Sequence, residues 1–116
     1  MNVPEHLEQE IAETGAVVRF GYPWWLRLIV FPGFRNGAVT LGRRIYVAAP
    51  EPQIPRFLRH ELTHVRQIGR LGLPRFLFRY LREYVANRRS GLDSDEAYRR
   101  ISFEEEAFAA EREEPI

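Results

Sequence analysis

Residues 58–67, with the sequence LRHELTHVRQ, carry the strongest pattern in the chain. Pro55 precedes them and is favoured at a first helical position, while Gly69 and Gly72 follow them and are typical of a helix end. We therefore expect a long amphipathic helix that begins near residues 54–56. Its apolar face recurs at helical spacing: Phe57, Leu58, Leu62, Val65 and Ile68.

Inside this helix, His60-Glu61-Leu62-Thr63-His64 has the spacing of a zinc site. Residues i and i+4 share one helix face, so the imidazoles of His60 and His64 can reach a single ion. A catalytic zinc takes three protein ligands and leaves one position for water. Glu61 directly follows the first ligand, and its carboxylate can take a proton from that water as a general base. The alternative is a pair of surface or core histidines that share this spacing by chance.

The third ligand is expected on a later helix, where residues 102–107 read SFEEEA. Consecutive helical side chains point about 100° apart, so only one of three adjacent glutamates can face a metal. Glu104 shares its face with Ala107 and Phe108, which we expect to be buried, and Glu104 is the predicted ligand. The other two carboxylates are expected in solvent or behind the ligands: Glu105 and Glu106. The alternative is that the whole run is a charged solvent face.

Composition excludes several other chemistries. The chain has 116 residues, of which 45% are hydrophobic and 28% charged, and we expect one globular domain over residues 1–116. It has no cysteine, which excludes disulfides, cysteine-ligated zinc and a thiol nucleophile. All 17 basic residues are arginine, so Schiff-base lysine chemistry is excluded too. The remaining histidine, His6, is expected to be a solvated helix residue.

Charge is divided along the chain. Residues 1–16 hold four glutamates and no arginine, residues 17–100 hold 16 arginines, and residues 101–116 hold six glutamates and one arginine. We expect the acidic ends to lie partly against the basic body. A basic surface for nucleic acid or anionic membranes is the alternative. The sequence contains no recognisable nucleic-acid-binding motif, so no nucleic-acid partner is expected.

The sequence also bears on the compartment. Residues 1–5 are polar and acidic and lack the basic and apolar regions of a signal peptide. The longest apolar stretch, residues 22–34, contains Arg27 and is shorter than the roughly 20 residues of a spanning helix. We therefore expect no transmembrane segment and a soluble, cytoplasmic protein.

The remaining elements predict an α+β domain. An Asn-Gly pair at residues 36–37 is a hairpin signal, and Gly42 interrupts a β-rich segment, which suggests a bulge or a close backbone approach. Residues 24–31 allow either a buried strand or two helical turns. Helices are predicted at residues 4–14, 75–89, 94–100 and 102–111, and strands at residues 16–22 and 38–47.

Two apolar features have two interpretations each. Helix 75–89 carries apolar residues at helical spacing, with arginines on its other side: Phe76, Leu77, Tyr80, Leu81, Tyr84 and Val85. We expect this apolar side to pack in the core, and a basic amphipathic helix on a membrane surface is the alternative. The pair Trp24-Trp25 is expected as a core anchor, with an exposed binding patch as the alternative.

Three stretches together resemble a known family. Residues 39–47 (VTLGRRIYV) are similar to a T-x-G-x-x-I-Y-V strand, and residues 58–67 are similar to an L-x-x-H-E-L-x-H-V-x-Q helix. Residues 98–107 (YRRISFEEEA) are similar to a Y-x-x-x-x-F-E-x-E-A glutamate helix. The chain thus resembles the gluzincin-type metallopeptidases, and more closely the very small minigluzincins and their bacterial relatives.

This resemblance implies a compact α+β zincin-like fold, with a small twisted sheet packed on the metal helix and a C-terminal glutamate helix. It implies a peptidase in which Glu61 is the base and in which strand 39–47 aligns an extended peptide or protein substrate by β-augmentation. Tyr98 is expected to donate to the developing oxyanion, and a buried tyrosine packed on the metal helix is the alternative. The implied zinc ligands are His60, His64 and Glu104.

The chain departs from the family at one position. Many gluzincins carry an aspartate four residues after the glutamate ligand, where this chain has Phe108. We therefore expect other groups, such as backbone carbonyls, to accept hydrogen bonds from His60 and His64. The alternative function is a zinc-stabilised protein-interaction module without useful turnover. An arginine-rich binder of nucleic acid or anionic surfaces is less favoured.

Overall fold

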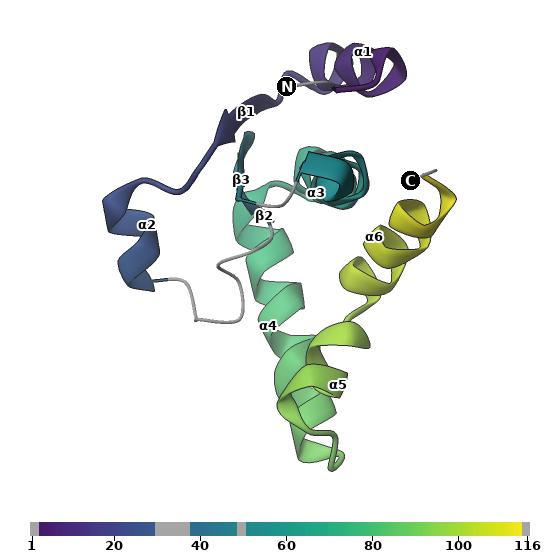
Figure 1. Cartoon of the computed structure of the whole chain (residues 1–116). Coiled ribbons are helices and arrows are strands. Elements are labelled where there is room, and N and C mark those ends of the chain that lie inside the picture. The colour runs from purple at the N-terminus through teal and green to yellow at the C-terminus, as the bar shows by residue number, and fades with distance from the viewer. Residues whose placement is uncertain (1–2, 30–37, 49–50, 115–116) are drawn as a thin grey trace.

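The computed structural model describes residues 3–29, 38–48 and 51–114, and these ranges confirm the α+β class (Figure 1). The predicted helices and the strand near residues 16–22 are present, and residues 24–29 adopt the helical alternative. The single edge strand expected over residues 38–47 is wrong, because a turn divides it into two antiparallel strands of which only the first lies at an edge of the sheet. The elements are α1 (Glu5–Thr14), β1 (Val17–Phe20), α2 (Trp24–Ile29), β2 (Ala38–Leu41), β3 (Arg44–Val47), η2 (Glu51–Gln53), α3 (Ile54–Leu71), α4 (Leu73–Arg89), α5 (Ser94–Arg99) and α6 (Ser102–Glu113).

The strands form a mixed sheet with the order β1-β3-β2, in which β1 is parallel and β2 antiparallel to the central strand β3. Leu41 pairs with Arg44, so Gly42 and Arg43 form a two-residue hairpin turn. Gly42 has a φ of 65°, a conformation that favours glycine. The expectation of a bulge or close approach at Gly42 is wrong, because a Cβ there would meet nothing within 4 Å. The Asn-Gly pair at 36–37 lies outside the described residues.

Helix α3 is the centre of the molecule. Seen along its axis, it has α1 above it, the sheet on one side and α6 on the other (Figure 1). Its apolar face packs on β3 and α1, because the stripe read from the sequence meets the apolar residues of those elements. The buried core cluster consists of Leu7, Ile45, Val47, Ile54, Leu58, Leu62 and Val65. The opposite side of α3 is thereby left to face α6.

Of the two glycines expected to end helix α3, only the second does so. Gly69 lies inside the helix, and Gly72 ends it, with its N–H donating to the carbonyl of Ile68 at 2.7 Å. Helix α4 begins directly after Gly72 and packs through Phe76 against Ile101 and Phe103. Within the described ranges, no helix is both long and apolar enough to cross a membrane.

The expectation that the whole apolar side of α4 is buried is wrong. Phe76 is buried, and Tyr80 and Tyr84 are partly buried beside it, because these three residues lie at spacings of four on the face that meets α6. The neighbouring face remains in solvent: Leu77, Phe78, Leu81 and Val85 are exposed.

The tryptophan pair is not a core anchor. Trp24 and Trp25 are both exposed on α2, although the ring of Trp25 makes an edge contact with that of Tyr46 at 6.0 Å. The buried members of this cluster are Tyr22, Leu26 and Tyr46, so the short helix is anchored by its leucine rather than by its tryptophans.

Candidate metal centre

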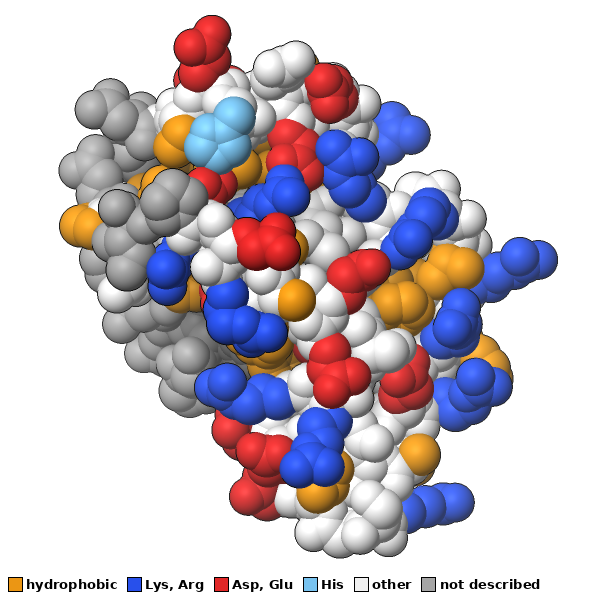
Figure 2. All heavy atoms as spheres, turned by 90° about the vertical axis from the view of Figure 1, so that its right-hand side faces the viewer, with side chains coloured by type: hydrophobic (Ala, Val, Ile, Leu, Met, Phe, Trp, Pro, Cys, Tyr) orange, Lys and Arg blue, Asp and Glu red, His pale blue; other side chains and the backbone are white. Residues whose placement is uncertain are grey.

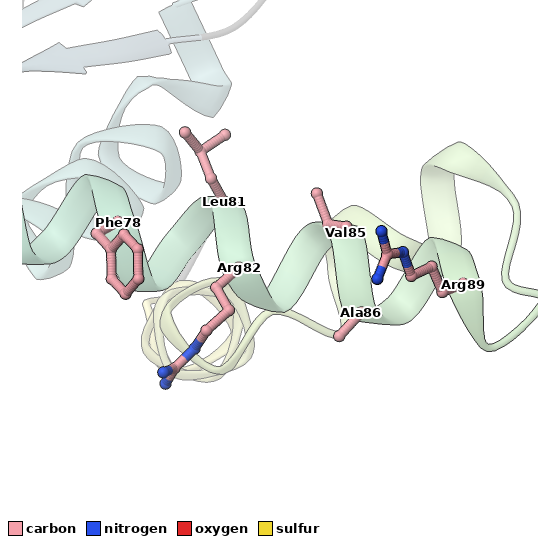
Figure 3. A pocket seen from close by; sticks show the side chains of 6 residues that line it. All are labelled: Phe78, Leu81, Arg82, Val85, Ala86 and Arg89. Atoms are coloured by element: carbon pink, nitrogen blue, oxygen red, sulfur yellow. The ribbon is translucent and has the colours of Figure 1, made fainter.

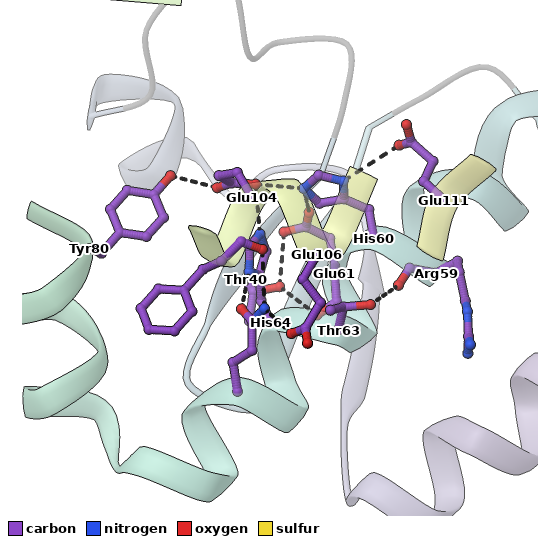
Figure 4. A network of polar contacts seen from close by, with 12 residues as sticks. Thr40, Arg59, His60, Glu61, Thr63, His64, Tyr80, Glu104, Glu106 and Glu111 are labelled. Carbon is purple, nitrogen blue, oxygen red and sulfur yellow. Dashed lines mark hydrogen bonds and ion pairs between the residues drawn. The ribbon is translucent and has the colours of Figure 1, made fainter. Parts of the chain in front are cut away.

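Two histidines of α3 and one glutamate of α6 meet between these helices (Figure 4). Glu104 Oε1 lies 2.8 Å from His60 Nε2 and 3.0 Å from His64 Nε2, and all three side chains are buried. Tetrahedral zinc with bonds of ~2.0–2.1 Å places its ligand atoms about 3.3 Å apart. Both distances from Glu104 Oε1 are therefore close to the spacing between zinc ligand atoms. Glu105 and Glu106 are exposed, as the helix-face argument predicts.

Glu61 lies at the side of this group. The ligand atoms of His60, Glu61 and His64 are all within 4.8 Å of one another, so this trio could also hold a metal ion. Glu61 Oε2 is 3.8 Å from His60 Nε2, and its Oε1 accepts a hydrogen bond of 2.9 Å from the hydroxyl of Thr40 on β2. Glu104 lies within hydrogen-bond distance of both imidazoles, whereas Glu61 is held by the strand, so Glu104 could be the third ligand.

The two buried carboxylates have opposite pKa shifts. Burial raises the pKa of Glu104, but the hydrogen bonds from His60 and His64 outweigh it and lower that pKa to about 2. Burial raises the pKa of Glu61 above its ordinary value, and the nearby imidazoles and Thr40 only partly oppose this. Such a separation of two carboxylates is typical of a site that needs one ionised group and one proton carrier.

Both ring nitrogens of His64 face oxygen acceptors. Its Nε2 donates to Glu104, and its Nδ1 donates to Oε1 of Gln67 at 2.9 Å. The orientation of the Gln67 amide is set by its other end, where Nε2 donates to the carbonyl of Phe103 at 3.1 Å and to Glu106 Oε1 at 2.5 Å. Burial lowers the pKa of His64, but the hydrogen bond and charge of Glu104 outweigh it and raise that pKa to about 9.

Side chains, not backbone carbonyls, lie at the second nitrogens of the histidines. For His64 the acceptor is Gln67, and the expectation of a carbonyl is wrong there because the residue three positions later on the helix reaches the ring first. His60 Nδ1 is buried and has no hydrogen-bond partner among the described residues. Glu111 Oε1 lies 3.6 Å from that nitrogen, and the ring of Phe108 packs edge-on against His60 at 4.6 Å.

Three tyrosines surround the carboxylates. Tyr80 donates to Glu104 Oε2 at 2.5 Å, and burial together with the charge of Glu104 raises the pKa of Tyr80. Burial and the charges of Glu104 and Glu61 also raise the pKa of Tyr98, so this predicted oxyanion donor lies beside both carboxylates. Burial, and then the charge of Glu61, raises the pKa of Tyr22 to about 12.

The sequence predicted the two helices that form the cluster, but it did not predict several residues that surround it. The predicted residues His60, Glu61, His64, Tyr98 and Glu104 all belong to this one cluster. The sequence held a signal for Gln67, because it lies three residues after His64 on the same helix. The other missed residues lie outside α3 and gave no such signal. The missed residues are Tyr22, Thr40, Gln67, Tyr80 and Glu111.

No protein-family model, curated protein or solved structure matches the chain. The function of the chain is therefore inferred from the chemistry of this cluster. Two imidazoles and an ionised carboxylate form a ligand set for zinc, and a second carboxylate of raised pKa beside them can hold or move a proton.

Proposed function

We propose that the chain is a zinc-dependent metallopeptidase with a zincin-like fold of the gluzincin type. One observation carries the proposal. The Glu104 carboxylate from α6 lies within hydrogen-bond distance of both imidazoles of the His60-Glu61-Leu62-Thr63-His64 segment on α3, although 40 residues or more separate them in sequence. Helices that only packed against each other would not need these three polar groups at their buried contact.

The residues fit zinc on chemical grounds. Two imidazole nitrogens and one carboxylate oxygen are a ligand set of catalytic zinc sites, which keep a further position for water or substrate. His64 and His60 offer Nε2 atoms to one point, and Gln67 fixes the ring of His64 from behind, as outer hydrogen bonds do at such sites. When bound, zinc would act as a Lewis acid and lower the pKa of a coordinated water.

Glu61 is the proposed proton carrier. Its raised pKa suits a group that takes a proton from the attacking water and returns it to the leaving amine. The Thr40 hydroxyl holds one carboxylate oxygen, so the other oxygen remains on the side of His60. Tyr98 is the proposed oxyanion donor, because it lies beside both carboxylates and a tyrosine hydroxyl can donate to an oxyanion.

The proposed substrate is an extended peptide or a protein segment. Strand β2 lies at an edge of the sheet, and such an edge can pair with an added strand. Thr40 belongs to this strand and contacts Glu61. A peptide paired with β2 would therefore run past the proposed base.

The first test is the zinc content of untagged protein purified without chelator, measured by elemental analysis. We expect one zinc per chain, weakened in His64→Ala and Glu104→Gln. Glu105→Gln is the matched control, because it removes the same charge from an exposed neighbour on α6. A chain that stays metal-free after zinc is offered would overturn the proposal.

The second test separates an enzyme from an inactive module. Glu61→Gln should retain zinc and folding but lower peptide cleavage by about 10²–10⁴-fold, the usual contribution of a general base. Cleavage is measured on a peptide library with the wild-type protein alongside. A zinc-loaded wild type without cleavage, or with cleavage equal to that of Glu61→Gln, would favour the zinc-stabilised interaction module.

A further inference from the structure

Helix α4 presents an apolar stripe to solvent. Leu77, Phe78, Leu81 and Val85 are 47%, 65%, 60% and 46% exposed. Leu77, Leu81 and Val85 recur at intervals of four and so form one line along the helix. A shallow groove runs along this side, as Figure 3 shows, lined by Phe78, Leu81, Arg82, Val85, Ala86 and Arg89.

The charges next to the stripe are positive and uncompensated. Arg82 and Arg89 line the groove, and Arg82 also lies over the ring of Phe78, 5.7 Å from its centroid. The described ion pairs engage arginines of other helices, such as Arg99 with Asp95 and Arg100 with Glu96, but none of α4. Five arginines lie on α4: Arg75, Arg79, Arg82, Arg88 and Arg89.

The one acid of α4 is turned away from the stripe. Glu83 accepts hydrogen bonds of 2.9 Å from the N–H and the hydroxyl of Ser102, at the start of α6. The basic side is therefore a local feature, since the whole chain has a formal net charge of only +1. Acidic side chains elsewhere are interleaved with basic ones on the face drawn in Figure 2.

We propose that the exposed side of α4 docks on an anionic lipid bilayer. Phenylalanine and leucine side chains can enter the boundary between headgroups and acyl chains while flanking arginines pair with lipid phosphates. A second copy of the chain fits this surface less well, because it would bring the same unpaired arginines together. The helix lies along the bilayer, and the stripe of α4 is on a different face from Tyr80, which contacts the metal centre. The proposal does not rest on the peptidase function.

The test is co-sedimentation with vesicles of phosphatidylcholine alone or mixed with phosphatidylglycerol. We expect binding to the anionic vesicles only, weakening as salt rises. The double variant Arg82→Gln/Arg89→Gln should weaken binding by about 30-fold, since each arginine near a bilayer contributes about a fivefold factor. Leu77→Gln/Leu81→Gln should weaken it by at least about tenfold through lost apolar burial. All four side chains are exposed, so these variants should fold.

The matched control is Arg99→Gln/Arg100→Gln, which removes the same charge from the end of α5 and the residue after it, where each arginine is paired with an acid. This control should bind as the wild type does. Equal loss in the control would show non-specific attraction and overturn the proposal. No binding to anionic vesicles would overturn it as well. So would a concentration-dependent dimer that Leu77→Gln/Leu81→Gln abolishes, because the stripe would then be an interface between copies.

Discussion

A single buried amide sets the state of one proposed ligand. Gln67 is fully buried, and its amide nitrogen donates to two acceptors, the carbonyl of Phe103 and the carboxylate of Glu106. The amide oxygen must then face His64, which must donate from Nδ1. This leaves Nε2 of His64 as the atom for a metal.

Removing this amide should weaken zinc binding. We expect Gln67→Leu, which has a similar volume but no acceptor, to lower zinc affinity by about 10–100-fold, the usual effect of losing a hydrogen bond behind a histidine ligand. Affinity is measured by competition with a chelator. Glu106→Gln is the control. In this variant the Phe103 carbonyl still orients the Gln67 amide, so the loss of zinc affinity should be smaller than in Gln67→Leu. Unchanged affinity in Gln67→Leu would show that the amide only fills space.

Zinc affinity should depend on pH through His64. In the metal-free protein both ring nitrogens donate and the pKa of His64 is raised to about 9, so zinc must displace a proton below that pH. Apparent affinity should therefore rise by about tenfold per pH unit up to about pH 9 and then level off. Chelator competition between about pH 7 and about pH 10 tests this slope. Binding heats in two buffers of different ionisation enthalpy report the proton released, and a flat profile would contradict the prediction.

The residues of the buried polar cluster could be predicted from sequence only in part. Helical spacing is a local property, so it assigned His60, His64 and Glu104 to the correct faces. Thr40 and Tyr80 were missed because they reach the carboxylates from other elements, and only the tertiary fold places them there.

At the scale of elements, the buried cluster of His60, His64 and Glu104 joins α6 to α3. Glu104 contacts both histidines, and Gln67 of α3 donates to the carbonyl of Phe103 and the carboxylate of Glu106 on α6. A polar cluster thus replaces part of the apolar contact between these helices. The position of α6 therefore depends on groups whose charge changes when a metal binds.

Loss of the Glu104 carboxylate should loosen α6 specifically. In metal-free protein, we expect Glu104→Ala to speed amide hydrogen exchange in α6 by at least about tenfold, because two histidines and Tyr80 lose their common acceptor. Helix α1 and strand β3, whose packing is apolar, should change less. Glu105→Ala is the matched control and should leave the exchange of α6 near the wild-type rate. A uniform increase along the whole chain would indicate global destabilisation instead.

Element types were predictable where apolar periodicity agreed with a proline at the start and a glycine at the end, as in α3. The buried face of an element was harder to predict than its type. In α4 two adjacent faces are apolar, and only contact with neighbouring elements selects that of Phe76, which packs with residues of α3 and α6, over that of Leu81. Likewise, Trp24 and Trp25 are apolar by type but lie on a short helix that buries Leu26. The sequence pattern cannot rank such faces, because their burial depends on the neighbouring element.

Across the whole molecule, the acidic ends lie against the basic middle, as the division of charge predicts. Near the N-terminus, Glu10 of α1 accepts hydrogen bonds from Arg59 and Arg66 of α3. Near the C-terminus, the carbonyl of Glu114 accepts a hydrogen bond of 3.1 Å from Arg56 of α3, and its carboxylate also lies within hydrogen-bond distance of His6 on α1. These contacts join the first and last helices to the same central helix.

Glu10 should therefore contribute more to stability than its exposed neighbour Glu13. The Glu10 side chain is 12% exposed and bridges two arginines, whereas that of Glu13 is 59% exposed and lies 4.0 Å from Arg66. We expect Glu10→Gln to lower the free energy of unfolding by about 1–2 kcal/mol, and Glu13→Gln by less than about 0.5 kcal/mol. Urea denaturation of metal-free protein measures both. Added salt should shrink the effect of Glu13→Gln first, because exposed pairs are screened more strongly than partly buried ones. Equal destabilisation by the two variants would mean that overall charge, and not the Glu10 contacts, holds α1 in place.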